Sequence, residues 1–297
     1  MIDVCMTVEG GPNSLSRLAL PESAALAGMR SSSFGGSPPP GQTIEFVDWP
    51  FTTDNPNAVR HRRVIDRTEP TLAVAPDIDG KFYTLETVID LADRYLESAE
   101  TVIIVPKGID PRDVPDRFRI GMPFQQSKSD EAFDIDELIQ PKQQRFGEMS
   151  RVEKYAAAGP VHVLGGNPAD QLRIRDESPI EVASVDTALP QQYAQFGRVW
   201  FKWGQMQVDP TPVPETLAWS LDNMVDAWNP RRSPHGDLLQ LVNRKPRQAA
   251  KAYGAALAGR PGTIFDQYLA DQTINPDRVQ RALRRIEDVV ASQADDD

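Results

Sequence analysis

Residues 159–187 read GPVHVLGGNPADQLRIRDESPIEVASVDT, and this stretch decides the fold that we expect. It contains two short apolar runs, Val161–Leu164 and Glu181–Val185, which are rich in β-branched residues and too short for helices. The first run ends in Gly165–Gly166 and the second in Asp186. Parallel α/β sheets build their active sites at the carboxyl ends of strands. We therefore expect Asp186 to face a planar ligand whose edge reaches the glycine backbone, where no Cβ stands in the way.

The rest of the chain contains six more runs with the character of strands. They are residues 2–8, 43–49, 70–78, 101–105, 119–124 and 198–201. With the two runs above they make eight strands, and most of the segments between them are long enough for right-handed crossovers. This count predicts a (β/α)₈ TIM-type barrel, a fold of the α/β class, with a doubly wound sheet as the alternative.

Two segments stand apart from this pattern. Residues 28–41, GMRSSSFGGSPPPG, are too poor in apolar side chains to pack as a regular element, so we expect either a disordered excursion or a long loop over a site. Residues 208–214, VDPTPVP, read as a Pro-rich linker. We therefore predict a catalytic barrel over residues 1–207 and a helical C-terminal appendage over residues 208–297. The helical patterns in that appendage cover residues 215–228, 245–257, 263–270 and 276–291.

The composition is acidic and poor in lysine. The chain of 297 residues has a formal net charge of −11, and only eight of its 32 basic residues are lysine. Such a surface is typical of proteins from a salt-rich cytoplasm, so we expect a halophilic origin, with an ordinary acidic protein as the alternative. The charge argues against non-specific binding of nucleic acid at low salt but not against a local basic groove.

The sequence also bears on compartment, metals and cofactors. It has no run of about 18 apolar residues and its amino terminus lacks a signal pattern, so we expect a cytoplasmic protein without a membrane partner. The single cysteine, Cys5, excludes an internal disulfide and a zinc site made of cysteines, and we interpret it as a small buried apolar residue. We expect neither a resident metal nor a cofactor.

The predicted strand ends carry carboxylates, an amide and a glycine pair: Asp48, Asp77, Asp79, Gln125, Gly165, Gly166 and Asp186. In a barrel these residues would share one pocket. A set of carboxylates with neither histidine nor cysteine suits covalent glycosyl chemistry, in which one carboxylate attacks an anomeric carbon and another moves a proton. The same oxygens could bind a divalent cation. We interpret His162, which lies inside a predicted strand, as a core residue with its hydrogen bonds satisfied.

The order of these strand ends resembles the tRNA-guanine transglycosylase superfamily, including its branch that places 7-deazaguanines in DNA. The resemblance covers roughly residues 43–187 and rests on FVDWPF, AVAPDID, RIGMPFQQ, VHVLGGNP and EVASVDT, in that order. Members of that family are (β/α)₈ barrels that exchange a guanine in nucleic acid for a 7-deazaguanine. They do so through a covalent intermediate at an aspartate.

The resemblance implies a role for each matching residue. Asp186 would be the nucleophile that attacks C1′, and Asp48 would be the proton shuttle. Asp77 would accept hydrogen bonds from the amide N–H and the exocyclic amine of a guanine-like base. Gln125 and the backbone N–H groups of Gly165 or Gly166 would donate to the carbonyl oxygen of that base.

The expected partners are a nucleic acid and a free 7-deazaguanine base. The tRNA enzymes of the family carry a cysteine-rich zinc site that this chain cannot build, so we favour DNA over tRNA. A homodimer is among the assemblies that the sequence allows. Candidate phosphate contacts, with plain surface charge as the alternative reading, are Arg60, Arg62, Arg63, Arg173 and Arg175.

Three other functions fit the same carboxylates. They are a carboxylate-based glycoside hydrolase, a metal-dependent lyase on a barrel, and a barrel that binds a purine without catalysis.

Overall fold

A computed structural model describes residues 2–8, 25–36, 43–50, 57–80, 82–124, 133, 135–139, 149–201, 204–207 and 213–229. The chain divides into two compact units, residues 1–192 and 193–297.

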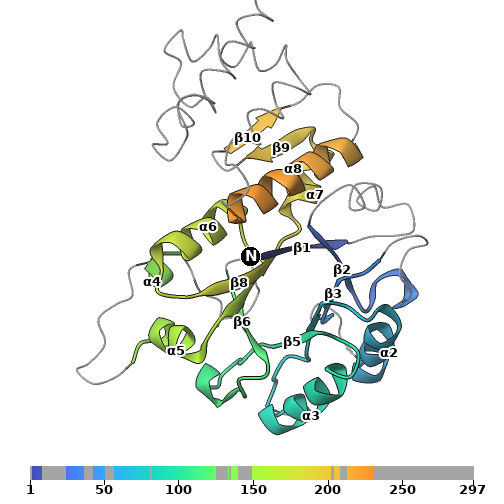
Figure 1. The fold of residues 1–297 in the computed structure, drawn as a ribbon, viewed down its shortest axis with the longest axis vertical. Helices are drawn as coiled ribbons and strands as arrows, with labels where there is room; N and C mark the ends of the chain where they lie inside the picture. The colour runs from blue at the N-terminus through green and yellow to red at the C-terminus, as the bar shows by residue number, and fades with distance from the viewer. Residues whose placement is uncertain are drawn as a thin grey trace, which may run out of the picture. The chain divides into compact units, whose positions relative to one another are not determined.

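The first unit contains a closed barrel of eight parallel strands, β1 to β8, in sequential order (Figure 1). The strands are β1 (Asp3–Val8), β2 (Leu26–Arg30), β3 (Phe46–Asp48), β4 (Leu72–Val74), β5 (Thr101–Ile104), β6 (Arg119–Pro123), β7 (Val161–Leu164) and β8 (Val182–Asp186). The prediction of a (β/α)₈ fold is confirmed, and the doubly wound alternative is excluded because the sheet closes.

The barrel closes between its first and last strands. β1 pairs with β2 on one side and with β8 on the other, and Cys5 lies opposite Leu26 and Asp186 in the two registers. Each strand therefore has two parallel neighbours, so the sheet has no free edge on which another chain could pair. The same registers bring the carboxyl ends of β8, β1, β2 and β3 to one rim.

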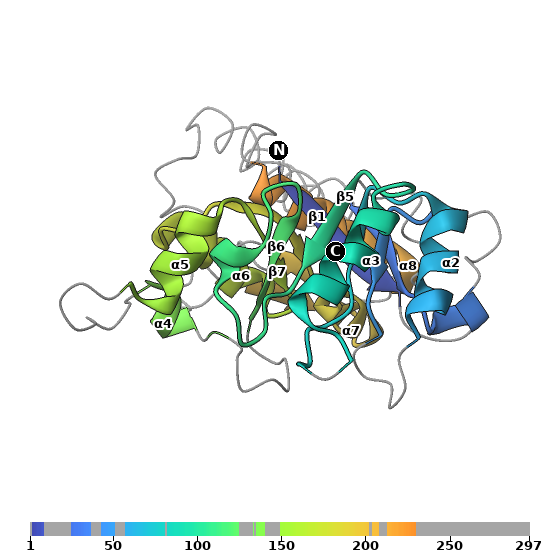
Figure 2. The same ribbon diagram turned by 90° about the horizontal axis from the view of Figure 1, so that it is seen from below.

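The helices that the structure describes in this unit lie outside the sheet (Figure 2). They are α2 (Ala58–Thr68), α3 (Leu85–Tyr95), α4 (Ile135–Ile139), α5 (Arg151–Ala158), α6 (Pro168–Glu177) and α7 (Leu189–Gln195), with short 3₁₀ turns η2 (Ser33–Gly36) and η3 (Pro111–Asp113).

Polar side chains fix the first turns of these helices. Asn57 Oδ1 accepts the N–H of Arg60 at 3.0 Å at the start of α2, and the side chain of Thr84 accepts the N–H of Thr87 at the start of α3. Ser150 and Glu153 form a reciprocal capping box at the start of α5. Each cap satisfies an N–H group that the helix itself leaves unpaired, so each helix starts at a defined residue after its strand.

The prediction for residues 28–41 is wrong at its start. Residues 28–30 belong to β2, residues 33–36 form η2, and residues 37–41 lie outside the described residues. Gly28 has the appearance of a loop residue, but its role is steric. A Cβ built there would lie 2.6 Å from Cδ1 of Phe46 on the neighbouring strand, so the core ring occupies the space that a side chain would need.

The run at residues 198–201 is a strand, but its assignment to the barrel is wrong. It forms β9 (Arg198–Phe201), which pairs antiparallel with β10 (Gly204–Gln207) in a separate two-stranded sheet. The helix predicted at 215–228 is α8 (Val213–Trp228). Two side chains of α8 bind the backbone of Trp200 on β9. Ser220 Oγ accepts the N–H of Trp200 at 3.0 Å, and Asn223 Nδ2 donates to the carbonyl of Trp200 at 2.8 Å.

The first compact unit ends at Gln192, within α7, and the predicted division into a barrel over residues 1–207 and an appendage over residues 208–297 stays a prediction. The other three predicted C-terminal helices lie outside the described residues.

A buried cluster fills the barrel below its carboxyl rim. It consists of Cys5, Phe46, Trp49, Leu72, Val74, Ile103 and Val105. Cys5 is fully buried, as expected, and burial raises the pKa of its thiol well above the usual value. Across the described residues, no helix has the length and apolarity needed to cross a membrane.

We predict that Gly28→Ala destabilises the barrel by roughly 1–3 kcal/mol, because the new methyl group overlaps the ring of Phe46. Urea unfolding of the variant and of the wild type measures this difference. In the double variant Gly28→Ala with Phe46→Leu, the loss of unfolding free energy should be smaller than the sum of the losses in the two single variants, because the smaller side chain removes the overlap. Strict additivity would contradict this explanation of Gly28.

Candidate active site

A cavity of about 200 Å³ opens at the carboxyl rim of the barrel. Its lining comes from the first unit, with Leu189 and Gln192 on α7 and the others at or just after strand ends: Arg30, Asp48, Trp49, Val74, Asp77, Val105, Lys107, Pro123, Leu164, Gly165, Gly166, Asp186, Thr187, Ala188, Leu189 and Gln192. Val74, Val105 and Trp49 also belong to the buried cluster, so the cavity is the open end of the core. This is the position at which barrel enzymes bind their substrates.

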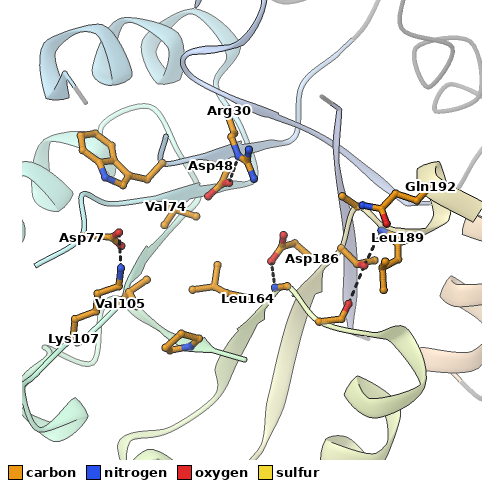
Figure 3. A pocket seen from close by; sticks show the side chains of 16 residues that line it. Arg30, Asp48, Val74, Asp77, Val105, Lys107, Leu164, Asp186, Leu189 and Gln192 are labelled. Carbon is orange, nitrogen blue, oxygen red and sulfur yellow. Dashed lines mark hydrogen bonds and ion pairs between the residues drawn. The ribbon is translucent and has the colours of Figure 1, made fainter. Parts of the chain in front are cut away.

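The three carboxyl groups that the sequence singles out share this cavity (Figure 3). Asp48 is the last residue of β3, Asp186 is the last residue of β8, and Asp77 follows β4 by three residues. Gly165 and Gly166, which follow β7, lie in the same lining. Strand closure thus brings together residues that are separated by more than a hundred positions in the chain.

Asp48 is buried beside a cation. Arg30, the last residue of β2, lies opposite Asp48 in the strand register, and its Nε is 3.3 Å from Asp48 Oδ2. Burial and the negative charge of Asp186 nevertheless outweigh Arg30 and raise the pKa of Asp48 to about 8. A carboxyl group in this state holds a proton near neutral pH and can release it to a base, which is what a general acid requires.

Asp77 has a cationic neighbour from the next strand. Lys107 Nζ lies 2.6 Å from Asp77 Oδ2, and both side chains are partly exposed to the cavity. The pair presents carboxylate acceptors and an ammonium donor side by side. It is therefore able to recognise a ligand edge that has N–H donors next to a carbonyl acceptor.

Asp186 is held by one of its two oxygens. Its Oδ1 accepts the N–H of Gly165 at 2.9 Å and lies 3.3 Å from Nε2 of His162. Among the described residues, no group forms a hydrogen bond to Oδ2 of Asp186. The Gly165 N–H, which the sequence suggested as a donor to a ligand carbonyl, is therefore already occupied in this structure.

The turn after β7 depends on its two glycines. Both have left-handed backbones, with φ of 71° at Gly165 and 93° at Gly166, and a Cβ at Gly166 would lie 2.3 Å from the ring of Phe124. The buried amide of Gln171 ties this turn to β8, because its Nε2 donates to the carbonyls of Gly165 at 2.7 Å and Asp186 at 2.9 Å. Two acceptor carbonyls fix which end of the amide is nitrogen.

The remaining predicted site residues are Gln125 and five arginines. Gln125 lies outside the described residues, so its role stays a prediction. The five arginines proposed for phosphate contacts lie on α2 and α6 and do not line the cavity.

Several of these arginines are paired on the surface. Arg62 contacts Asp66 and Glu97, and Arg173 and Arg175 contact the acidic side chains Glu177 and Asp176. Arg60 lies in the first turn of α2, which begins at the carboxyl face of the barrel, whereas the α6 pair lies further from that face along its helix.

Sequence reasoning missed three residues of the site. Arg30 was hidden in a segment interpreted as a loop, and Lys107 carried no signal beyond its place after a buried strand. His162 was interpreted as a core residue; it is fully buried, but its ring contacts Asp186. The available signal for His162 was the spacing of Ser184 and Asp186 on the neighbouring strand. Residues two apart on a strand point to the same face, so both could contact one side chain on β7.

A carboxylate with a free oxygen beside a carboxyl group that keeps its proton is the pair needed for nucleophilic displacement with general-acid help. Among the described residues, no cluster of three or more histidine, cysteine or acidic side chains could hold a metal ion.

The fold and the cavity define a (β/α)₈ barrel with a carboxylate site at the carboxyl ends of its strands. Residues 22–229 match a family described as "Family of unknown function (DUF6610)", and because the match covers more than half of the chain, the chain belongs to this family. No curated protein matches the chain.

We predict that the stability difference between the wild type and Asp48→Asn depends on pH. The pKa of Asp48 is about 8 in the folded chain, against an ordinary value of 3.8, so between these values the folded chain binds the extra proton. Wild-type stability should therefore fall, relative to the variant, as pH rises through this window, with a slope approaching about 1.4 kcal/mol per pH unit. Denaturant unfolding at several pH values measures it.

The exposed Asp90→Asn variant is the control for the substitution itself. A difference between wild type and Asp48→Asn that stays constant across this window would contradict the assignment of a raised pKa to Asp48.

Proposed function

We propose that this chain is a base-exchange transglycosylase that replaces guanine in nucleic acid with a 7-deazaguanine, through a covalent link between Asp186 and the sugar. The observation that carries the proposal is the meeting of Asp48, Asp77 and Asp186 around one cavity, with their differing partners. DNA is the favoured substrate and tRNA the alternative, and the reaction would take place in the cytoplasm.

In the first half of the reaction, Asp186 Oδ2 attacks C1′ of the target nucleoside. The C1′–N9 bond breaks, its electron pair goes to the base, and the base takes the proton of Asp48 and leaves as neutral guanine. In the second half, the incoming 7-deazaguanine gives its N9 proton to Asp48 and attacks C1′, and the Asp186 carboxylate is released. Asp48 ends with the proton it started with, so no further reactant is needed.

The pair formed by Asp77 and Lys107 supports a guanine-like base. The Watson–Crick edge of guanine presents two N–H donors and then a carbonyl acceptor. The oxygens of Asp77 would accept from the two donors, and Lys107, 2.6 Å from Asp77, would donate to the carbonyl. Val74 and Val105 provide apolar surface for the ring. A target base would have to leave its stack to reach this cavity.

A carboxylate-based glycoside hydrolase would use the same acid and nucleophile. It would differ in what completes the second half, because water rather than a base would attack C1′. Release of guanine without incorporation of a second base would therefore favour hydrolysis over exchange. Assays in both dilute and concentrated salt are appropriate, since the acidic composition predicts a requirement for salt.

We predict that Asp186→Asn lowers base exchange by at least about 10³-fold while leaving the affinity for free base within about threefold, because only covalent attack needs the anionic oxygen. Release of labelled guanine from DNA and from tRNA, in the presence of a 7-deazaguanine, measures the first quantity, and titration calorimetry measures the second. Exchange at the wild-type rate would remove Asp186 from the role of nucleophile.

We predict that Asp77→Asn weakens binding of free guanine or 7-deazaguanine by roughly 10–150-fold, because the amide loses charge-assisted acceptors worth roughly 1.5–3 kcal/mol. Asp79→Asn is the matched control, since Asp79 lies two residues further along the same loop and does not line the cavity. Equal affinities of Asp77→Asn and the wild type for both bases would overturn the placement of the base beside Asp77.

A further inference from the structure

A buried histidine lies directly behind the proposed nucleophile. The ring of His162, on β7, is fully buried inside the barrel and stacks on Phe46 with centroids 5.5 Å apart. Both ring nitrogens have partners on β8, since Nδ1 lies 2.7 Å from Ser184 Oγ and Nε2 lies 3.3 Å from Asp186 Oδ1. His162 is therefore bound at two points by the strand that carries Asp186.

The hydrogen-bonded chain continues to the opposite end of the barrel. Arg119, the first residue of β6, donates from Nη1 to Ser184 Oγ at 2.9 Å, and the same nitrogen lies 3.6 Å from Asp3, the first residue of β1. The strand registers place Ser184 opposite both Asp3 and His162. Polar groups thus connect the amino ends of the strands to Asp186 at the carboxyl rim, through an interior that is otherwise largely apolar.

This series of hydrogen bonds indicates which ring nitrogen of His162 carries hydrogen. Asp186 Oδ1 is an acceptor, so Nε2 of His162 must carry the hydrogen that faces it. In the neutral ring Nδ1 is then an acceptor, and it accepts a hydrogen bond from the Ser184 hydroxyl. Arg119 donates to the Ser184 oxygen from the other side, which leaves the hydroxyl hydrogen to point toward Nδ1.

The arrangement also selects the reactive oxygen of Asp186. Its two donors, His162 Nε2–H and the N–H of Gly165, both meet Oδ1. Oδ2 accepts no hydrogen bond from any described residue. The Asp186 side chain is 14% exposed and lines the cavity. The donors therefore lock the rotation of the carboxylate with Oδ2 available for attack.

We propose that His162 is a positioning residue for the nucleophile Asp186, and that Ser184 and Arg119 hold it in the tautomer that does so; the catalytic part of this inference rests on the proposed function. When Oδ2 forms its bond to C1′, Oδ1 becomes the carbonyl oxygen of the ester and keeps both donors. When the incoming base displaces Asp186, the electron pair of the C1′–Oδ2 bond returns to a carboxylate that these donors stabilise. The histidine therefore assists both halves without gaining or losing a proton.

The first test needs no substrate. Nitrogen-15 NMR of the imidazoles, with His162 assigned by substitution, should report a neutral ring with hydrogen on Nε2. Ser184→Ala should broaden or shift the His162 signals by removing the donor to Nδ1, while Ser178→Ala, which changes a helix-end serine on α6, should leave them unchanged. A ring with hydrogen on Nδ1, or a doubly protonated ring, would overturn the proposed donor and acceptor roles in this series of hydrogen bonds.

The second test measures the reaction. His162→Phe keeps an aromatic ring against Phe46 but lacks the donor, so the rate of covalent-intermediate formation in a single turnover should fall by on the order of 100-fold per folded molecule, with affinity for free base unchanged. His162→Gln, whose amide nitrogen can reach the place of Nε2, should recover at least a tenth of the wild-type rate. The control for loss of a buried histidine is His61→Phe, because a ring nitrogen of His61 bonds the Val74 carbonyl and, within the described part of the chain, no carboxylate bonds that ring.

The outcomes separate this inference from the proposed function. If the wild type exchanges bases and His162→Phe forms the intermediate at the wild-type rate, the positioning role is wrong and the transglycosylase proposal survives. If the wild type exchanges no base on DNA or tRNA, while NMR finds hydrogen on Nε2 and its dependence on Ser184, the proposed function fails and the orientation of the carboxylate by His162 stands. Equal loss of rate in His162→Phe and in the control His61→Phe would reduce His162 to a packing role and overturn the inference.

Discussion

The site exists because the last strand of the sheet pairs with the first. The pairing of β8 with β1 places Asp186 opposite Cys5, and the pairing of β1 with β2 and of β2 with β3 carries the same rim on to Asp48. An open sheet with the same strands would leave Asp186 at one edge, far from Asp48. Closure therefore does more than satisfy backbone hydrogen bonds, since it also sets the electrostatic coupling between the two carboxyl groups, which contributes to the raised pKa of Asp48.

That coupling gives the two aspartates different properties although their side chains are identical. Asp48 is buried and holds its proton to an unusually high pH, in spite of Arg30. Asp186 is held from one side by a main-chain N–H and a histidine and faces the cavity with its other oxygen. The same cavity therefore offers an acid and a nucleophile at once, and Asp77 with Lys107 offers a third, separate polar edge. Environment rather than residue type distinguishes the roles.

The sequence was most informative where apolar runs end in polar residues. Asp48, Asp77 and Asp186 could be predicted to meet because carboxyl ends of parallel strands share a rim, and seven of the eight barrel strands could be recognised from β-branched runs. β2 was missed because Gly28 is a residue type typical of loops. The ring of Phe46 leaves room only for glycine there, and no local sequence pattern reveals this contact. β9 was placed in the barrel because strand composition does not tell which sheet a strand joins. His162 and Lys107 could not be assigned, since their roles depend on partners 24 and 30 residues away.

Gln171 has a consequence for how the rim can move. Its side-chain nitrogen bridges the carbonyls of Gly165 and Asp186, while Gly165 in turn donates to the carboxylate of Asp186. These three hydrogen bonds link the first turn of α6 to the ends of β7 and β8. We therefore expect the two strand ends to keep their spacing, and Asp186 its orientation, when the helix shifts against the barrel.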